Sequence, residues 1–222
     1  MTQPSHSNRM RTRDRGLTIC QHNVNKSLIV QSDFLHQLNP DIYDFTAIQE
    51  PYFDSNHNSR ATHHWYTVYP KEHYVTPSQM RTIILVNKQL ATDTWSQLDF
   101  GLPYVTAVVV STGRGKVWLV NMYNDIGHQQ GLQKAVQAFW KRVCVGNPVS
   151  HAEETIWLGD FNLHHPLLDK ECNGHLFTRS NLEKSQILID ALAEFDLQMA
   201  LPKDMPTLQA LSTGNHTRCY VP

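Results

Sequence analysis

Apolar and polar positions alternate with two different periods along the chain, one typical of strands and one typical of helices. Short runs rich in β-branched and aromatic residues predict strands at residues 17–23, 41–49, 65–69, 81–86, 104–111, 116–123, 155–159 and 197–201. Apolar residues that recur at helical spacing predict helices at residues 27–38, 129–143 and 180–193. Strands that alternate with helices and then form hairpins indicate an α/β domain with mixed sheets.

Turn-forming residues separate these elements. Asn39 and Pro40 end the first helix, because the residue before a proline avoids the helical conformation. Residues 51–64 are polar and predict a long loop, and residues 112–115 suit a hairpin connection. Residues 155–159 form a short apolar run, which is typical of a strand inside a covered sheet. We expect the chemistry on loops at the strand ends.

Length and composition favour one globular domain. The 222 residues are 41% hydrophobic and 18% charged, which excludes a disordered chain. No run approaches the roughly 18 apolar residues of a membrane span, and the first residues lack the apolar segment of a signal peptide. The four cysteines show no paired spacing, and Cys20 and Cys144 are expected as small buried hydrophobes. We therefore expect an intracellular protein, cytoplasmic or nuclear, with no membrane partner.

The net charge of -1 leaves no overall basic excess. Proteins that hold nucleic acid through many phosphates usually carry such an excess, so any nucleic-acid contact must rest on a local patch. Residues 1–16 are basic, with arginines at alternate positions. We expect this segment to be a disordered N-terminal arm.

Polar residues follow four of the predicted strands. They are Asn23; Glu50; Tyr123, Asn124 and Asp125; and Asp160 and Asn162. A carboxylate or amide at the end of a buried strand is costly to place there without a partner. If these strand ends converge, their oxygens form the kind of cluster that Mg²⁺ prefers, completed by waters and a substrate phosphate.

Each of these residues also has a simpler interpretation when taken alone. Asn23 and residues 159–162 suit ordinary turns. Glu50 suits an exposed loop, and Tyr123 suits a core aromatic residue with its hydroxyl at the surface.

Four short motifs, taken together in their order along the chain, favour a functional site over these simpler interpretations. They are Gln21-His22-Asn23, Gln49-Glu50-Pro51, Met122-Tyr123-Asn124 and Gly159-Asp160-Phe161-Asn162. In this order they resemble the endonuclease/exonuclease/phosphatase superfamily, which includes pancreatic deoxyribonuclease, abasic-site endonucleases and inositol polyphosphate phosphatases. Gln-Glu-Pro followed by residues 159–166 (GDFNLHHP) looks most like the endonuclease domains of non-LTR retrotransposons. Residues 206–208 and 215–218 are similar to fungal members of that group.

The resemblance implies a four-layer α/β sandwich of the DNase I-like type over residues 17–222. Two facing mixed β-sheets are flanked by helices, and the active site lies at one edge between loops from both sheets. The implied cofactor is Mg²⁺, with Mn²⁺ as an alternative. The implied substrate is DNA, nicked at a genomic target to prime reverse transcription, and no obligate protein partner is evident.

The resemblance also assigns roles to individual residues. Glu50 matches the carboxylate that binds the metal, and Asn23 matches the amide that helps to hold the metal or the scissile phosphate. Tyr123 matches the tyrosine that donates a hydrogen bond to a phosphate oxygen. Asp160 matches the acid that orients or deprotonates the attacking water, and Asn162 matches the amide that steadies the phosphate.

Three further residues, Asn124, His164 and His165, are expected to contact nucleic acid. The two histidines also suit ordinary surface positions or a zinc site. Zinc is disfavoured, because adjacent histidines lack the usual ligand spacing and no cysteine pair accompanies them.

The sequence departs from the family after residues 215–218. Family members continue with a strand that carries an aspartate and with a later Ser-Asp-His motif, whereas no aspartate or histidine follows Arg218 here. We therefore expect a C-terminally truncated domain that lacks its final strand or strands and has impaired activity. The alternatives are a catalytically inactive remnant with at most weak nucleic-acid or metal binding, and a phosphatase or deadenylase of the same superfamily.

Overall fold

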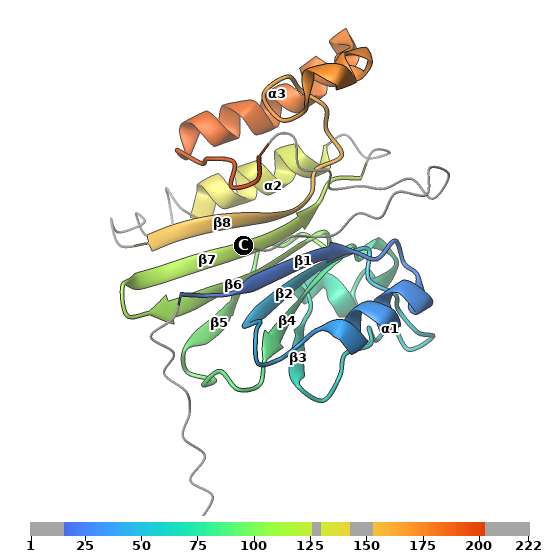
Figure 1. Cartoon of the computed structure of the whole chain (residues 1–222), viewed down its shortest axis with the longest axis vertical. Coiled ribbons are helices and arrows are strands. Elements are labelled where there is room, and N and C mark those ends of the chain that lie inside the picture. Colours follow the sequence, from blue (N-terminus) through green and yellow to red (C-terminus); the bar gives the residue numbers. More distant parts are fainter. Residues whose placement is uncertain (1–15, 126–129, 143–152, 203–222) are drawn as a thin grey trace, which may run out of the picture.

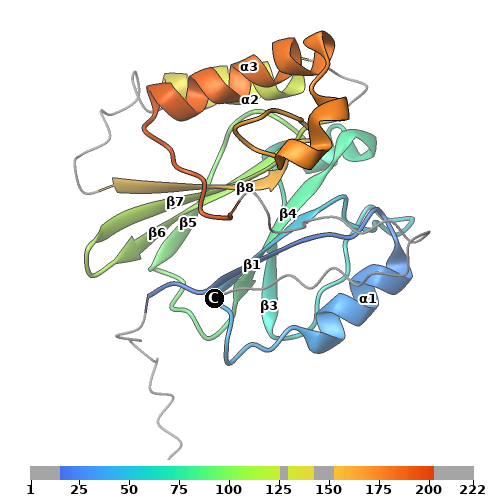
Figure 2. The ribbon, with the colours of Figure 1, turned by 45° about the horizontal axis from the view of Figure 1, so that its top comes forward.

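Two four-stranded sheets lie face to face in the computed structural model, with helices on both outer faces (Figure 1; Figure 2). The structure describes residues 16–125, 130–142 and 153–202. The expected N-terminal arm (apart from Gly16), the stretches 206–208 and 215–218, any final strand, Cys144 and Cys219 lie outside these residues. The layers of helix, sheet, sheet and helix confirm the predicted four-layer α/β sandwich.

The first sheet has the strand order β1-β2-β4-β3. Its members are β1 (Ile19–Asn23), β2 (Phe45–Gln49), β3 (Trp65–Val68) and β4 (Thr82–Asn87). β1 and β2 are parallel and the other pairs are antiparallel, so the sheet is mixed. Helix α1 (Leu28–Gln37) joins β1 to β2, and it begins where the Ser27 hydroxyl accepts a hydrogen bond from the Val30 amide at 3.3 Å.

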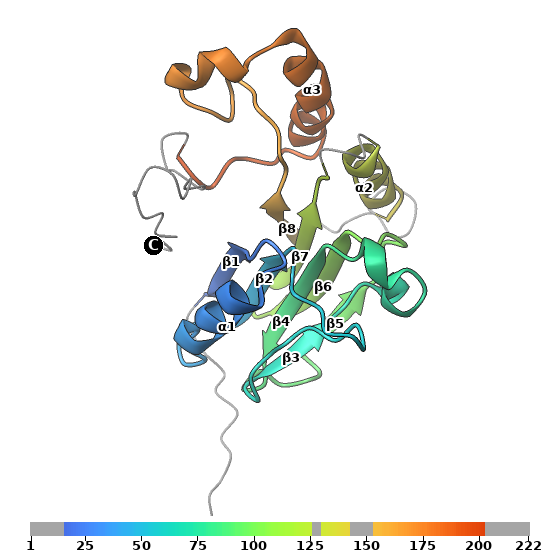
Figure 3. The ribbon, with the colours of Figure 1, turned by 90° about the vertical axis from the view of Figure 1, so that its right-hand side faces the viewer.

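The second sheet has the strand order β5-β6-β7-β8. Its members are β5 (Trp95–Leu98), β6 (Val105–Thr112), β7 (Gly115–Tyr123) and β8 (Glu153–Asp160). The predicted hairpin at residues 112–115 is confirmed, because Thr112 pairs with Gly115 between β6 and β7. The pair β7 and β8 is parallel, and α2 (Gly131–Trp140) lies between them in sequence. Helices α2 and α3 (Arg179–Glu194) cover the outer face of this sheet (Figure 2; Figure 3).

Short 3-10 helices complete the described elements: η1 (Lys71–Tyr74), η2 (Pro77–Gln79) and η4 (Glu171–Leu176). Between the two sheets, one apolar cluster includes Phe45, Ile84, Val108 and Leu119. A second cluster packs the first sheet under α1, and a third packs the second sheet under α2 and α3. Alternate residues along each strand therefore supply different layers, as the two-residue period of a strand requires.

Strand β8 corrects one prediction from the apolar pattern. Residues 155–159 do form a strand, but it is the edge strand of the second sheet in the described part of the chain, and Ile156 is 37% exposed. One face of β8 still packs well, because the Trp157 ring lies 5.1 Å from Phe139 and 6.0 Å from Phe195. An apolar run indicates that both faces of a strand are covered, but it does not indicate whether both of its edges pair with other strands.

The strand predicted at residues 197–201 is wrong. α3 ends through a backbone cap in which Asp196 is left-handed (φ 52°) and the Leu197 amide donates to the Leu192 carbonyl at 2.9 Å. Residues 198–202 then continue without strand pairing, and Met199 and Leu201 are exposed.

Other boundaries shift by a few residues. β2 begins at Phe45 because a turn follows Pro40, and β5 was not predicted at all. The predicted helix at 129–143 is α2, whose expected first and last residues lie outside the described ones. Cys20 is buried, as predicted.

Within the described residues, no helix has the length and apolar character needed to cross a membrane.

Candidate active site

The polar residues predicted from the strand ends lie where β1 and β2 of one sheet meet β7 and β8 of the other. Gln21 on β1 makes a two-point contact with Gly159 on β8. The Gln21 side chain donates to the Gly159 carbonyl at 2.8 Å and accepts from the Gly159 amide at 3.1 Å. This side chain joins the two sheets one residue before Asp160.

Gly159 is required by the close approach of β7. A Cβ atom at this position would lie 2.1 Å from the Met122 carbonyl oxygen, which is backbone and cannot turn away. The glycine therefore lets β8 lie close to β7 at the point where the chain leaves the sheet.

Asp160 is held through both of its carboxylate oxygens. The Asn23 side chain donates to Oδ2 at 2.8 Å, and the Asn162 amide donates to Oδ1 at 3.1 Å. Asn23 Oδ1 in turn accepts from the Asn25 amide at 2.9 Å. The structure thus brings together Asn23, Asp160 and Asn162, three of the predicted site residues.

Asn162 and Asn124 connect the two loops that follow β7 and β8. Asn162 is left-handed (φ 48°), and its side chain donates to the Asn124 carbonyl at 2.8 Å. The Asn124 side chain donates to the Phe161 carbonyl at 2.7 Å, and its amide donates to the Asp160 carbonyl at 2.9 Å. Asn124 is only 9% exposed, so it holds the loop from inside. Contact between Asn124 and nucleic acid stays a prediction.

Glu50 adopts an unusual backbone conformation at the end of β2. Its φ is 47°, and its amide donates to the Arg81 carbonyl at 2.7 Å. Its carbonyl accepts from the Lys26 amide at 2.6 Å, and its Oε1 lies 3.4 Å from the Lys26 ammonium. A left-handed residue other than glycine is costly, so these contacts hold Glu50 against a local strain.

Tyr123 links the two acidic residues of the site. Its hydroxyl donates a hydrogen bond to the Glu50 carboxylate. Burial, followed by the negative charges of Glu50 and Asp160, raises the pKa of Tyr123 to about 12. Asp125 adds to this effect. The phenol therefore stays protonated near neutral pH and acts as a hydrogen-bond donor, and the charges of Glu50 and Asp160 both act on it.

The donor set fits a hard divalent cation. The charges of Glu50, Asp160 and Asp125 create a negative potential at the half-buried Tyr123 that a cation would neutralise, and Mg²⁺ commonly takes only one or two protein carboxylates. Glu50 supplies such a carboxylate, and Asn23 Oδ1 keeps a second lone pair beside its contact with the Asn25 amide. Among the described residues, no group of three or more His, Cys, Asp or Glu side chains is arranged as a metal cluster.

His164 and His165 shape the loop after Asn162. The His165 amide donates to Asp169 Oδ2 at 3.0 Å, and His165 Nδ1 accepts from the Leu167 amide at 3.1 Å. His164 Nδ1 lies 3.5 Å from the same Asp169 oxygen. Their contact with nucleic acid stays a prediction.

Four residues with contacts at the site carry no role predicted from the sequence: Gln21, Lys26, Gln49 and Asn121. Gln49 and Asn121 are fully buried and join the sheets, with Gln49 Nε2 donating to Asn121 Oδ1 at 2.5 Å. The only signal in the sequence is an amide residue inside an apolar strand, which is costly unless paired. Lys26 gives no such signal, because it lies in a turn.

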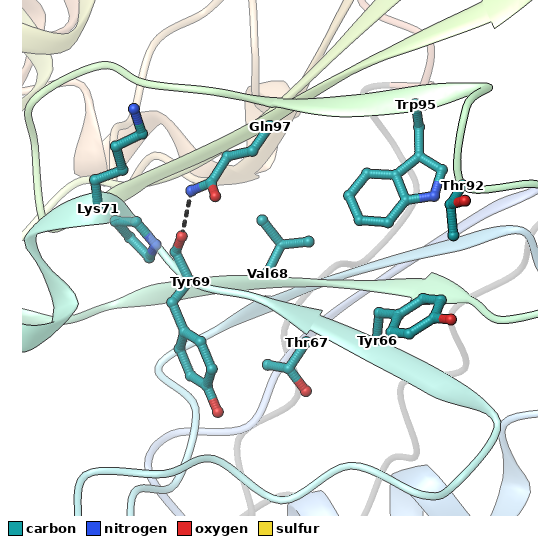
Figure 4. Close-up of a pocket in the computed structure, with 9 residues that line it drawn as sticks. Tyr66, Thr67, Val68, Tyr69, Lys71, Thr92, Trp95 and Gln97 are labelled. Atoms are coloured by element: carbon teal, nitrogen blue, oxygen red, sulfur yellow. Dashed lines mark hydrogen bonds between the residues drawn. The ribbon is translucent and has the colours of Figure 1, made fainter.

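A separate groove lies between β3 and β5, at the opposite side of the sandwich from β1 and β8 (Figure 4). It is lined by residues including Tyr66, Lys71 and Trp95, and the Gln97 side chain crosses it to donate to the Tyr69 carbonyl. The predicted site residues do not line it.

The two mixed four-stranded sheets and their helices form a DNase I-like fold. The chain is similar in structure to the endonuclease domain of TRAS1, a telomere-specific non-LTR retrotransposon. The TM-score is 0.66 at 14% identity, over 90% of this chain and 80% of that domain. This similarity confirms the predicted DNase I-like fold class.

Weaker similarities involve TDP2 structures. Humanized D. rerio TDP2 gives a TM-score of 0.45 at 14% identity, and Caenorhabditis elegans TDP2 gives 0.44 at 16% identity. Each covers 67% of this chain, which spans 63% and 48% of those chains respectively. No protein-family model and no curated protein matches the sequence.

Proposed function

We propose that this chain is a Mg²⁺-dependent endonuclease that hydrolyses phosphodiester bonds in DNA. The observation that supports this most directly is the hydrogen bond from the Asn23 side chain to Asp160 Oδ2, which joins the ends of β1 and β8. The charges of Glu50 and Asp160 also both act on the Tyr123 hydroxyl. The fold shared with the TRAS1 endonuclease domain supports the choice of reaction class. No contact in the described residues favours a phosphatase or a deadenylase over an endonuclease.

The hydrogen bonds around Asp160 suit the orientation of an attacking water. Asn23 and the Asn162 amide fix both carboxylate oxygens, so the carboxylate has one defined orientation in which a remaining lone pair can accept a proton from water. A bound Mg²⁺ supplies neutralisation of the charge that develops on the phosphate. Glu50, with the Asn23 oxygen, would hold the ion.

Tyr123 and Asn162 suit the phosphate itself. The raised pKa of Tyr123 keeps its hydroxyl protonated, and turning that donor from Glu50 to a phosphate oxygen supplies a neutral hydrogen bond without repulsion. Asn162 lies beside Asp160, and turning its side-chain amide from the Asn124 carbonyl to the phosphate would supply a second neutral donor. Catalysis of this kind depends mainly on positioning and charge stabilisation.

Plasmid nicking in Mg²⁺ tests the proposal. We expect Glu50→Gln and Asp160→Asn each to lower the nicking rate by roughly 10²-fold or more. Asp99→Asn is the matched control. Asp99 is a partly exposed carboxylate outside the site, and its Oδ2 lies 3.4 Å from the Lys71 ammonium. Nicking that survives both site changes, or that Asp99→Asn lowers equally, contradicts the assignment.

Binding without turnover is a second candidate function, and it rests on the surroundings of Asp160. In the described part of the chain, its oxygens accept only from amides and no histidine contacts it. A carboxylate without such a partner is a weak base near neutral pH. Mn²⁺ binding that Glu50→Gln abolishes, together with no nicking of DNA at any metal concentration, would establish this second function.

A further inference from the structure

Lys26 is tied to Glu50 at two points. Its ammonium lies 3.4 Å from Glu50 Oε1, and its amide donates to the Glu50 carbonyl at 2.6 Å. Asn25 and Lys26 are both left-handed, with φ values of 48° and 55°. The turn after β1 therefore uses two unfavourable backbone conformations to bring this one lysine against this one carboxylate.

The two side chains differ in freedom. The Glu50 side chain is 13% exposed and also accepts from the Tyr123 hydroxyl, whereas the Lys26 side chain is 54% exposed. A lysine side chain is long and flexible, so the ammonium can leave while its backbone stays anchored. The carboxylate lacks this freedom.

Arg81 does not share this position, although its carbonyl accepts from the Glu50 amide. The Arg81 guanidinium instead donates to the main-chain carbonyls of Ser78 and Met80, at 2.9 and 2.8 Å. Lys26 is thus the cation that the described contacts place on Glu50.

We propose that Lys26 is a positioning residue that occupies Glu50 as a counter-cation, yields it to the divalent metal, and then holds a phosphate of the DNA. This inference rests on the proposed function, because it takes the metal to bind at Glu50. Two cations cannot share one carboxylate oxygen without mutual repulsion, so metal binding displaces the ammonium. The displaced ammonium remains tethered beside Glu50 through the Lys26 amide, within reach of a phosphate bound there.

Mn²⁺ binding without DNA, followed by electron paramagnetic resonance, tests the first half. We expect Lys26→Met to bind Mn²⁺ about fivefold more tightly, because a competing ion pair with one exposed partner is removed. Lys26→Arg keeps the charge and should stay within about twofold of the wild-type affinity. Lys71→Met is the control, because Lys71 forms an ion pair of the same 3.4 Å length with Asp99. A disturbed fold would weaken Mn²⁺ binding, so tighter binding separates competition from damage.

DNA binding tests the second half, with Asp160→Asn present in every protein to prevent turnover. In Mn²⁺, we expect Lys26→Met to lower the slope of log affinity against log salt by about one unit. In EDTA, where Lys26 stays on Glu50, the slope should be unchanged, and Lys71→Met should leave it unchanged in both conditions.

The outcomes distinguish this inference from the proposed function. If Glu50→Gln abolishes Mn²⁺ binding but Lys26→Met leaves it unchanged or weaker, the role of Lys26 is overturned and the metal site stands. If Glu50→Gln leaves Mn²⁺ binding unchanged, the metal does not bind at Glu50, and both the proposed function and the role of Lys26 are overturned.

Discussion

Asp160 lies at the end of β8 with both carboxylate oxygens bound by amides, one from Asn23 and one from Asn162. For single residues, the sequence indicated which ones form the candidate site, because they lie at or just after the ends of apolar runs. It did not indicate which side chains these residues contact. Gln21 and Lys26 act through residues more than 20 positions away, and neither periodicity nor spacing records such a contact.

His73 is a single residue whose environment predicts a change in stability. It is 1% exposed, no described residue hydrogen-bonds either ring nitrogen, and it stacks on Tyr69 at 4.1 Å. We expect His73→Phe to raise the free energy of unfolding by about 1–2 kcal/mol at pH 7.5, because it keeps a ring and removes two unpaired buried polar atoms. Urea denaturation measures the change. His36→Gln on the exposed side of α1 should be neutral.

The same residue predicts a dependence on pH. Burial, followed by the charge of His57, lowers the pKa of His73, so the unfolded chain takes up the proton first as the pH falls. Stability is therefore lost as the pH falls below about 6.5, and burial of His22 acts in the same direction. The advantage of His73→Phe over wild type should be larger at pH 5.5 than at pH 7.5. An equal advantage at both values contradicts a neutral buried His73.

Among the elements, the long helices and paired strands were predictable because their apolar residues recur with a clear period. β5 was not, since Ser96 and Gln97 in its middle are exposed and leave little apolar alternation. The edge position of β8 was also hidden, because strand order depends on contacts with a chain segment far away in sequence. The terminal strand predicted after α3 was wrong because Leu197 belongs to the helix cap and residues 198–202 pair with no strand.

Gly159 allows a test of the contact between strands β7 and β8. Gly159→Ala places a Cβ 2.1 Å from the Met122 carbonyl, so β8 must move away from β7 and carry Asp160 with it. We expect a loss of roughly 1–3 kcal/mol in unfolding free energy, and a loss of nicking at temperatures where the protein is still folded. Gly113→Ala in the hairpin is the control, because nothing lies within 4 Å of its added Cβ. Wild-type nicking by Gly159→Ala refutes the need for this close approach.

Across the whole molecule, buried polar contacts hold the two sheets together near the site. Asn121 accepts from Gln49 at 2.5 Å and donates to the Ile48 and Ile83 carbonyls at 3.0 and 2.9 Å. The Thr82 and Thr106 hydroxyls meet at 2.9 Å beside them. The general architecture was predictable from alternating elements, but this register between sheets was not, because it depends on individual amide contacts in the interior.

Asn121→Ala tests this coupling between the sheets. We expect it to lower the free energy of unfolding by about 2–4 kcal/mol, because it leaves a cavity and an unpaired buried amide on Gln49. The double change Thr82→Val and Thr106→Val removes both hydroxyls together and should cost less. Denaturant unfolding compares the two proteins. An equal or smaller loss for Asn121→Ala contradicts its role in joining the sheets.

The order of strands divides the candidate site into two halves of unequal support. Asn23 and Asp160 end border strands of the described sheets. Glu50 follows β2 and Tyr123 ends β7, and both of these strands are flanked on both sides. Fraying that begins at a border therefore reaches Asn23 and Asp160 before it reaches Glu50 and Tyr123. If the proposed function holds, gentle heating or dilute denaturant would silence hydrolysis while the inner strands of both sheets are still folded.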